Sequence, residues 1–227
     1  CIIHRYKIAV VGAKGCGKTA FARRLARDIF YEADNALQNN SPPFRQFFHC
    51  EQSDGNRIKI ELIDVSVEQL DEHVRTANTI RQRLVVGEPI SVKCTEFVDL
   101  CGIFLLYDTT DSKSFDGLHN IIGDLSHLTS PGCEIFLIGC KSDLREQRKI
   151  SFKEAEDFAI RIGFSLFETS SKSGLNCTNA LMEMVDKIYE KQEEAACYIC
   201  DSVEEEETAS VQRFNIPNIF CNLWNCQ

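Results

Sequence analysis

The chain has 227 residues, 44% of them hydrophobic, with a formal net charge of −9 and twelve cysteines. This composition suffices for a sizeable folded core, and no stretch reaches the roughly 18 uninterrupted apolar residues of a membrane-spanning helix. No basic stripe favours a nucleic-acid-binding protein. The cysteines are scattered through expected core strands, which favours a reduced, cytoplasmic setting over a disulfide-bonded secreted protein.

The first expected strand, Lys7–Val11, leads directly into a glycine-rich turn with the pattern G-x-x-x-x-G-K-T. In such a turn consecutive backbone N–H groups point at a polyphosphate, and the following helix N-terminus adds a favourable dipole. Lys18 would place its charge on the outer phosphates, and the Thr19 hydroxyl would bind Mg²⁺. An ordinary glycine turn is the alternative, but the strand–turn–helix context favours a site for a nucleoside triphosphate or diphosphate. The residues expected to contact it are Gly12, Lys14, Gly15, Cys16, Gly17, Lys18, Thr19 and Ala20.

A helix is expected after this turn, because apolar residues recur at helical spacing at Phe21, Leu25 and Ile29. Cys16 lies at the N-terminus of this helix, where the helix dipole lowers the pKa of a thiol, so we expect an oxidation-sensitive cysteine. The arginines expected on the solvated side of the helix are Arg23, Arg24 and Arg27.

Five further strands are expected along the chain. The first two flank Asp54-Gly55, a strong hairpin signal. Polar and apolar residues alternate in Arg57–Leu62, as in a half-exposed strand, whereas Ile103–Leu106 and Ile135–Ile138 are continuously apolar, as in buried parallel strands. The five strands are Phe47–Glu51, Arg57–Ile63, Gly102–Tyr107, Glu134–Gly139 and Ser165–Glu168.

Two later helices complete the pattern. Ser151 and Glu154 form a capping box, and the helix that follows should bury Phe152, Ala155, Phe158 and Ile162. The last helix is expected from about Cys177 to Gln192. Strands that alternate with helices predict the α/β fold of P-loop NTPases: a doubly wound, mostly parallel six-stranded sheet with helices on both faces and the ligand at the carboxyl ends of the strands.

Cys140-Lys141-Ser142-Asp143 follows the fifth expected strand directly. It resembles the N-K-x-D motif of Ras-superfamily GTPases, in which the aspartate accepts hydrogen bonds from guanine and the lysine stem packs along the base. Lys141 and Asp143 match that motif, but Cys140 stands at the asparagine position, and a thiol is a weaker hydrogen-bonding group than an amide. The resemblance implies a guanine site of lowered affinity; taken alone, these residues are equally those of a polar turn.

The stretch E-T-S-S-K, which begins at Glu168, follows the sixth expected strand and is similar to the E-T-S-A-K loop of Ras and Rab proteins. In the family, backbone N–H groups of this loop contact the guanine O6, which implies that role for Ser170, Ser171 and Lys172. Tyr107–Phe115 likewise resembles a Rab segment with a structural role. A serine-rich loop with a helix cap is the alternative, but the order of these blocks along the chain favours the resemblance.

The resemblance covers about Tyr6 to Gln192, and it identifies a divergent Rab-like small GTPase whose G domain we expect at residues 1–192. It implies a molecular switch in vesicle and membrane trafficking, with GTP or GDP and Mg²⁺ as cofactors. The implied partners are effector, exchange-factor and activating proteins that bind the switch regions. The implied location is the cytoplasm or the cytosolic face of an intracellular membrane.

The family sequence D-T-A-G-Q-E after the third strand is replaced here by Asp-Val-Ser-Val-Glu-Gln at residues 64–69. Asp64 keeps its place and is expected to hold Mg²⁺ through a water. Val67 replaces the glycine that approaches the γ-phosphate, and a β-branched side chain hinders that approach. Glu68 replaces the glutamine that orients the attacking water, and Gln69 would serve only if the loop shifted by one residue. With Gln69 and Glu68 as the only candidate catalytic residues, we expect weak or impaired GTP hydrolysis; the alternative is a non-hydrolysing scaffold that binds nucleotide and recruits protein partners.

Both switch regions depart from the family in other ways. Ser41 is the only candidate for the Mg²⁺-binding hydroxyl of the first switch, and a plain polar loop residue is an equal alternative. The second switch is enlarged at about residues 65–98, and the spacing of apolar residues predicts a helix over Glu68–Val86. We expect this segment to bind partners, unless it is a tolerated insertion.

Residues 193–227 are expected to form an acidic, cysteine-containing flexible tail. Cys221 and Cys226 are candidate lipidation sites, although the C-terminal sequence matches no prenylation signal cleanly. A zinc site formed by these two cysteines with Cys197 and Cys200 is one alternative. Incidental cysteines in a flexible tail are the other.

Overall fold

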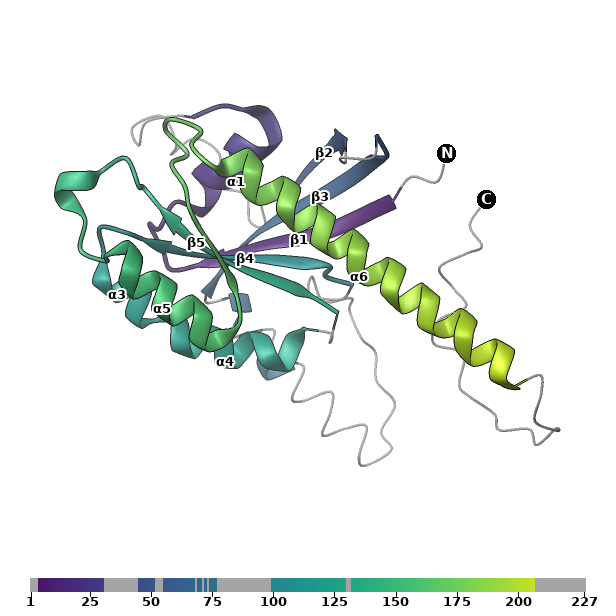
Figure 1. Ribbon diagram of the computed structural model, residues 1–227. Coiled ribbons are helices and arrows are strands. Elements are labelled where there is room, and N and C mark those ends of the chain that lie inside the picture. The colour runs from purple at the N-terminus through teal and green to yellow at the C-terminus, as the bar shows by residue number, and fades with distance from the viewer. Residues whose placement is uncertain are drawn as a thin grey trace. The chain divides into compact units, whose positions relative to one another are not determined.

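A six-stranded sheet lies in the first of the two units into which the chain divides, residues 1–190 and residues 191–227. The structure is a computed structural model, and it describes residues 4–30, 45–51, 55–67, 69, 70, 72, 74–76, 99–129 and 132–206. The strands are β1 (His4–Gly12), β2 (Arg45–Glu51), β3 (Arg57–Ser66), β4 (Gly102–Asp108), β5 (Glu134–Cys140) and β6 (Ser165–Glu168), in the spatial order β2-β3-β1-β4-β5-β6 (Figure 1). β2 runs antiparallel to β3, and the other paired strands are parallel. The predicted doubly wound, mostly parallel sheet and its hairpin are confirmed.

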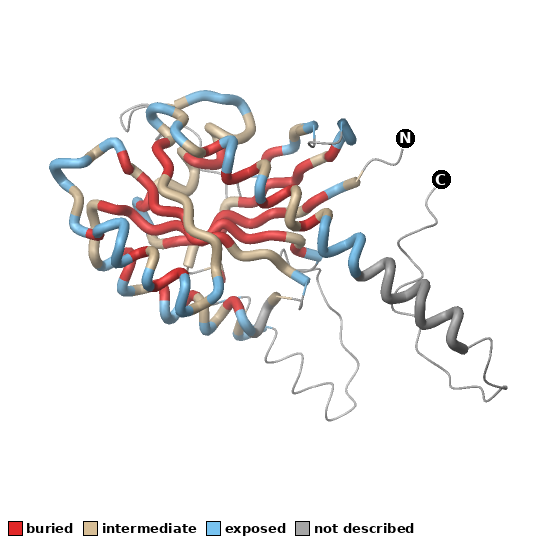
Figure 2. The backbone as a smooth tube through the Cα atoms, viewed as in Figure 1, coloured by how far each residue is buried: buried red, intermediate tan, exposed pale blue. Residues whose placement is uncertain are grey.

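Helices cover both faces of this sheet. They are α1 (Lys18–Arg27), α3 (Ser112–Asp116), α4 (Leu118–Leu128), α5 (Phe152–Ile162) and α6 (Cys177–Glu206), with a short 3-10 helix, η2 (Arg145–Gln147). One layer of the core joins one sheet face to α1 and to the part of α6 in the first unit, and the other joins the opposite face to α3, α4 and α5. Figure 2 shows the buried residues running along the central strands and the inner sides of the helices.

The helix boundaries follow local signals, with three differences from expectation. The Ser151 hydroxyl accepts the Glu154 N–H at 3.2 Å, as the capping box predicts, but Phe152 at the first position of α5 is 49% exposed and not inward. α1 ends at Arg27, because Asp28 takes a left-handed conformation with φ 53°, and Ile29 beyond it is 38% exposed. α6 does not stop near Gln192 but continues to Glu206.

The alternation expected along β3 is also interrupted at one polar position. Glu61 is only 2% exposed, where the pattern predicted a half-exposed side chain. Its carboxylate accepts from Arg5 Nη2 at 2.5 Å and from Arg45 Nη1 at 3.2 Å, so β1 and β2 supply the charges that make its burial tolerable. The residues described just after β3, which are 67, 69, 70, 72 and 74–76, are helical, and Leu70 is fully buried. The rest of the expected helix, to Val86, lies outside the described residues.

Candidate nucleotide site

The glycine-rich turn after β1 has a backbone that only glycine adopts without strain. Gly15 and Gly17 have φ of 84° and 106°, and Gly17 is the residue that caps the start of α1. A Cβ placed on Gly12 would lie 2.5 Å from the Leu106 carbonyl oxygen and 2.9 Å from Cys16 Sγ, so this position has no room for a side chain. The first turn of α1 therefore presents its N–H groups beside a turn built for close backbone approach, the arrangement that binds phosphate.

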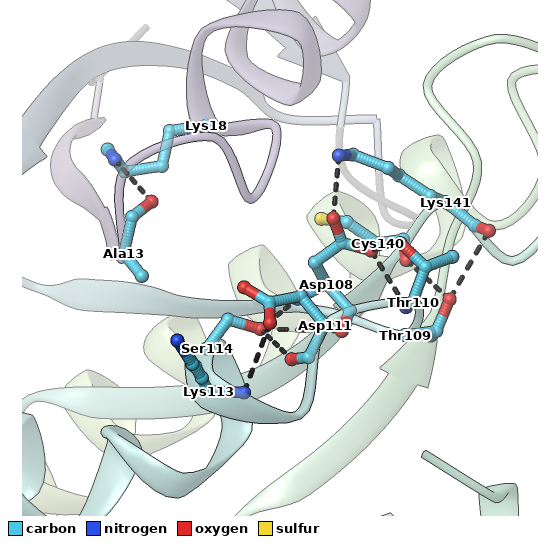
Figure 3. A network of polar contacts seen from close by, with 10 residues as sticks. All are labelled: Ala13, Lys18, Asp108, Thr109, Thr110, Asp111, Lys113, Ser114, Cys140 and Lys141. Atoms are coloured by element: carbon cyan, nitrogen blue, oxygen red, sulfur yellow. Dashed lines mark hydrogen bonds and ion pairs between the residues drawn. The ribbon is translucent and has the colours of Figure 1, made fainter. Parts of the chain in front are cut away.

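Lys18 and Thr19 at the start of α1 face the strand ends. Lys18 Nζ donates to the carbonyl oxygens of Gly12 and Ala13, each at 2.9 Å, and the bond to Ala13 is drawn in Figure 3. Thr19 Oγ1 donates to Asp64 Oδ2 at 2.6 Å, although the two residues are 45 positions apart. Burial raises the pKa of the Asp64 carboxyl, while the Thr19 hydrogen bond and the charges of Lys18 and Arg23 lower it. A hydroxyl oxygen and a carboxylate oxygen held together beside a lysine are the ligands that Mg²⁺ prefers next to a polyphosphate. These residues therefore fit the ion.

The end of β4 holds the loop after β5 in place. Lys141 Nζ donates to Asp108 Oδ2 at 2.6 Å, and Asp108 Oδ1 accepts from the N–H and hydroxyl of Thr110 (Figure 3). Thr109 donates from its backbone and its hydroxyl to the Cys140 carbonyl, at 3.1 and 3.0 Å. Lys141 itself is in the left-handed region, with φ 61°. These contacts fix the turn that presents Asp143, whose side chain is exposed.

The loop after β6 lies against the loop after β5. The Ser142 N–H donates to the Thr169 carbonyl at 3.1 Å, and the Thr169 N–H donates to the Gly139 carbonyl at 2.7 Å. The Ser170 hydroxyl accepts the Ser173 N–H at 3.1 Å, which closes a tight turn over the serine-rich stretch. The two segments expected to contact the base, 140–143 and 170–172, are thus adjacent, at the carboxyl ends of neighbouring parallel strands.

Two cysteines expected to contact the ligand have buried side chains. Cys16 and Cys140 are 1% and 2% exposed and belong to the same core layer as Cys177. Burial raises the pKa of Cys16 and raises that of Cys140 well above the ordinary value. The expectation of an oxidation-sensitive Cys16 is therefore wrong, because removal of the thiol from water outweighs the helix N-terminus.

The segment after Asp64 departs from a glycine loop in its backbone as well as its sequence. β3 continues to Ser66, with Val65 and Ser66 paired in register with Val11 and Gly12 of β1. A helix begins immediately afterwards, and Ser66 and Gln69 cap it: the Ser66 N–H donates to Gln69 Oε1 at 2.9 Å, and the Gln69 N–H donates to Ser66 Oγ at 3.2 Å. The Gln69 carboxamide oxygen is thereby committed to a helix cap.

Other expected positions lie outside the described residues: Ser41, Glu68, Cys221 and Cys226. Cys197 and Cys200 lie in the part of α6 whose side chains are not described. Within the residues that are described, no group of three or more histidine, cysteine or acidic side chains is placed to hold a metal. A search of the same residues found no helix with the length and hydropathy needed to span a membrane.

Sequence reasoning missed the residues that brace the two base loops. Arg24, expected on a solvated face, has a side chain only 14% exposed and donates to the Ser171 and Lys172 carbonyls. Arg148 forms a two-pronged ion pair with Glu168, at 2.5 and 2.7 Å. Asp108 fixes Lys141 as described above. Only Asp108 had a sequence signal, because it follows an apolar strand whose carboxyl end faces the site.

Comparison with known proteins agrees with this architecture. The model of the Ras family matches residues 91–190. The Ras-related protein Rab-8A of Gallus gallus is 28% identical over 188 residues, which are 83% of this chain and 80% of that protein. The Ras-related protein Rab-13 of Bos taurus is 29% identical over 185 residues, covering 82% and 80%. With its six-stranded sheet and these likenesses, the chain resembles the small GTPases of the Ras superfamily, and among them the Rab proteins.

Proposed function

We propose that the chain is a guanine-nucleotide-binding protein of the Rab type that hydrolyses GTP slowly and acts as a switch in membrane trafficking. One observation carries the proposal: the phosphate turn, the Thr19–Asp64 pair and both base loops meet at the carboxyl ends of β1, β3, β5 and β6. Parallel α/β sheets bind ligands at that edge, where the strand order reverses. The likeness to Ras and Rab proteins supports guanine as the base.

Each group has a distinct part in this proposal. The N–H groups of the turn and Lys18 bind the phosphates, and Thr19 with Asp64 holds Mg²⁺, which would neutralise phosphate charge. Asp143 accepts from the N1–H and amine of guanine, a pattern that adenine does not offer. The backbone N–H groups of Ser171 and Lys172 donate to the guanine O6, because the Ser170 N–H already donates to the Leu175 carbonyl at 3.1 Å. Lys141, held by Asp108, lies beside the base.

Slow hydrolysis is proposed from the segment after β3. Phosphoryl transfer to water needs a residue that orients the attacking water, and the catalytic positions are Glu68 and Gln69. A carboxylate at residue 68 repels the triphosphate, and the Gln69 amide oxygen is occupied by the Ser66 N–H. That cap also favours the second candidate function, a scaffold that holds GTP without turnover, because an intact strand–helix junction gives Gln69 no route to the γ-phosphate.

The partners and location are proposals by family. Effector, exchange-factor and activating proteins would bind the enlarged second switch, and the protein would work in the cytoplasm or on the cytosolic face of an intracellular membrane. Lipidation at Cys221 or Cys226 would supply one membrane signal, and stable anchoring takes two. An acidic tail opposes attachment to an anionic leaflet.

The test is a single-turnover measurement on purified protein loaded with GTP, with bound nucleotide followed by chromatography. Slow conversion to GDP supports the switch, GTP retained intact for many hours supports the scaffold, and no retained nucleotide overturns both. Asp143→Asn is the matched control, because an amide donates where the carboxylate only accepts. This variant should bind GTP more weakly and xanthosine triphosphate more tightly than the parent does, since xanthine carries a carbonyl at C2 in place of the amine.

A further inference from the structure

We propose that Arg24 is a positioning residue that sets how long guanine nucleotide stays bound, by holding the loop after β6 from the side of α1. The inference rests on the proposed function, because the loop it holds is the one assigned to the guanine O6. Arg24 lies two turns along α1 from the phosphate turn, so it joins the helix that binds phosphate to the loop that binds base.

The Arg24 guanidinium donates hydrogen bonds to backbone oxygens of two segments. Nε donates to the Ser171 carbonyl at 2.7 Å, and Nη2 donates to the Lys172 carbonyl at 2.9 Å. Nη1 donates to the Asp28 carbonyl at 3.1 Å and to its carboxylate at 2.9 Å. The Arg24 side chain is 14% exposed while Asp28 is 89% exposed, so a partly buried guanidinium is oriented by a carboxylate at the surface. Charge-assisted bonds of this kind are stronger than neutral ones.

Holding the two carbonyls fixes the direction of neighbouring N–H groups. A peptide unit is planar, so its C=O and N–H point in opposite directions. With the Ser171 carbonyl turned toward Arg24, the Lys172 N–H must point to the other side of the loop. The next unit is held at both ends, because the Lys172 carbonyl accepts from Arg24 and the Ser173 N–H donates to Ser170 Oγ. The Lys172 N–H is therefore held in one direction, away from Arg24, before any base arrives.

The shape of the loop also suits an arginine at this position. Gly174 has φ 83°, and a Cβ built on it would lie 4.0 Å from Arg24 Cδ, so the stem of Arg24 runs beside the turn at contact distance. Two adjacent carbonyls match the Nε and Nη2 prongs of a planar guanidinium. A lysine ammonium is a single point and reaches one carbonyl at a time. From the base side, the buried thiol of Cys140 supplies a weak polar group where the family has an amide.

The experiment measures release of bound GDP from the full chain and from Arg24→Ala and Arg24→Lys. Both variants should release GDP faster, by about tenfold for alanine if one charge-assisted bond to the loop is lost. Arg24→Lys should recover less than half of the difference in the logarithm of the GDP release rate between the parent and Arg24→Ala, because a lysine lacks the two parallel donors of the guanidinium. The matched control is Arg161→Ala, which removes an arginine that packs over the Phe158 ring on α5.

A second nucleotide separates positioning from general loosening of α1. In 6-thioguanosine diphosphate a sulfur, a weak acceptor, replaces O6 while N1–H and the amine remain. If Arg24 acts through the O6 donors, Arg24→Ala speeds release of this analogue by no more than about twofold to threefold. Equal acceleration of both nucleotides, or a GDP release rate within twofold of the parent in both variants, overturns the inference alone. A parent chain that binds no GDP overturns the proposed function and the inference with it.

Discussion

Ser66 and Gln69 bond each other reciprocally at the junction where β3 ends, the Ser66 N–H to Gln69 Oε1 at 2.9 Å and the Gln69 N–H to Ser66 Oγ at 3.2 Å. Val65 and Leu70 on either side of the pair are buried in one core layer. The segment that would close over a γ-phosphate is therefore anchored as strand and helix. Movement of Gln69 toward a nucleotide would break the cap and expose two donors of the helix terminus.

Gln69→Ala should leave the single-turnover hydrolysis rate within about twofold of the parent, because this side chain serves the cap and not the water. It should also lower the free energy of unfolding by roughly 0.5–1 kcal/mol, measured by urea titration. Asp116→Ala, at an exposed site on α3, is the control for stability. A fall of tenfold or more in hydrolysis would show instead that Gln69 reaches the reaction.

Asp64→Asn should make nucleotide release insensitive to Mg²⁺. In the parent, chelation of Mg²⁺ should speed GDP release by about tenfold or more, since a carboxylate whose pKa is raised by burial gains most from a bound cation. The variant should release GDP fast with or without chelator. The measurement is GDP release by filter binding at both Mg²⁺ levels, with Asp116→Asn as the control. If the GDP release rate of Asp64→Asn still increased with chelator, Asp64 would not be a ligand of the ion.

Cys177→Ala should flatten the loss of stability at alkaline pH. Burial raises the pKa of this thiol to about 11, against 9.0 for an ordinary cysteine. Between these values the unfolded chain releases the proton and the folded chain keeps it, so stability falls as pH rises from 9 to 11. The total loss from this group is roughly 3 kcal/mol.

The measurement is the melting temperature of the parent and of Cys177→Ala at pH near 8 and near 10.5. The drop between the two pH values should be smaller in the variant, whatever the absolute melting temperatures. Identical drops would mean that the folded protein does not hold the Cys177 proton more tightly than the unfolded chain does.

Cys16 should react with a maleimide at neutral pH at least about tenfold more slowly than the half-exposed Cys133. The reagent cannot reach a buried thiol, and a raised pKa leaves little of that thiol in the reactive thiolate form. The measurement is peptide mass spectrometry after timed labelling of the folded protein, with labelling in urea as the reference for equal intrinsic reactivity. Fast labelling of Cys16 in the folded state would contradict its burial.

Much of the fold and the phosphate turn of the candidate site could be predicted, because both depend on local sequence patterns. The glycine spacing of the phosphate turn, the apolar runs of β4 and β5 and the hairpin signal each depend on neighbouring residues alone. The Ser66–Gln69 cap was also present as an S-x-x-Q pattern, which predicts a helix start once it is noticed. The helix was expected over Glu68–Val86, but the role of Gln69 was argued from the loop that the resembled family has at that point.

What the tertiary structure alone decided are the partners of charged side chains. Arg24 carries the helical pattern of a solvated residue, yet its side chain is only 14% exposed, because a loop 147 positions later brings two carbonyls to it. Glu61 alternates as an exposed strand residue, yet it is buried between Arg5 and Arg45 from two neighbouring strands. A sequence pattern reports which face of its own element a residue occupies. Whether that face meets water or a distant donor and acceptor depends on how the elements pack, and that packing determines whether burying a charge is favourable.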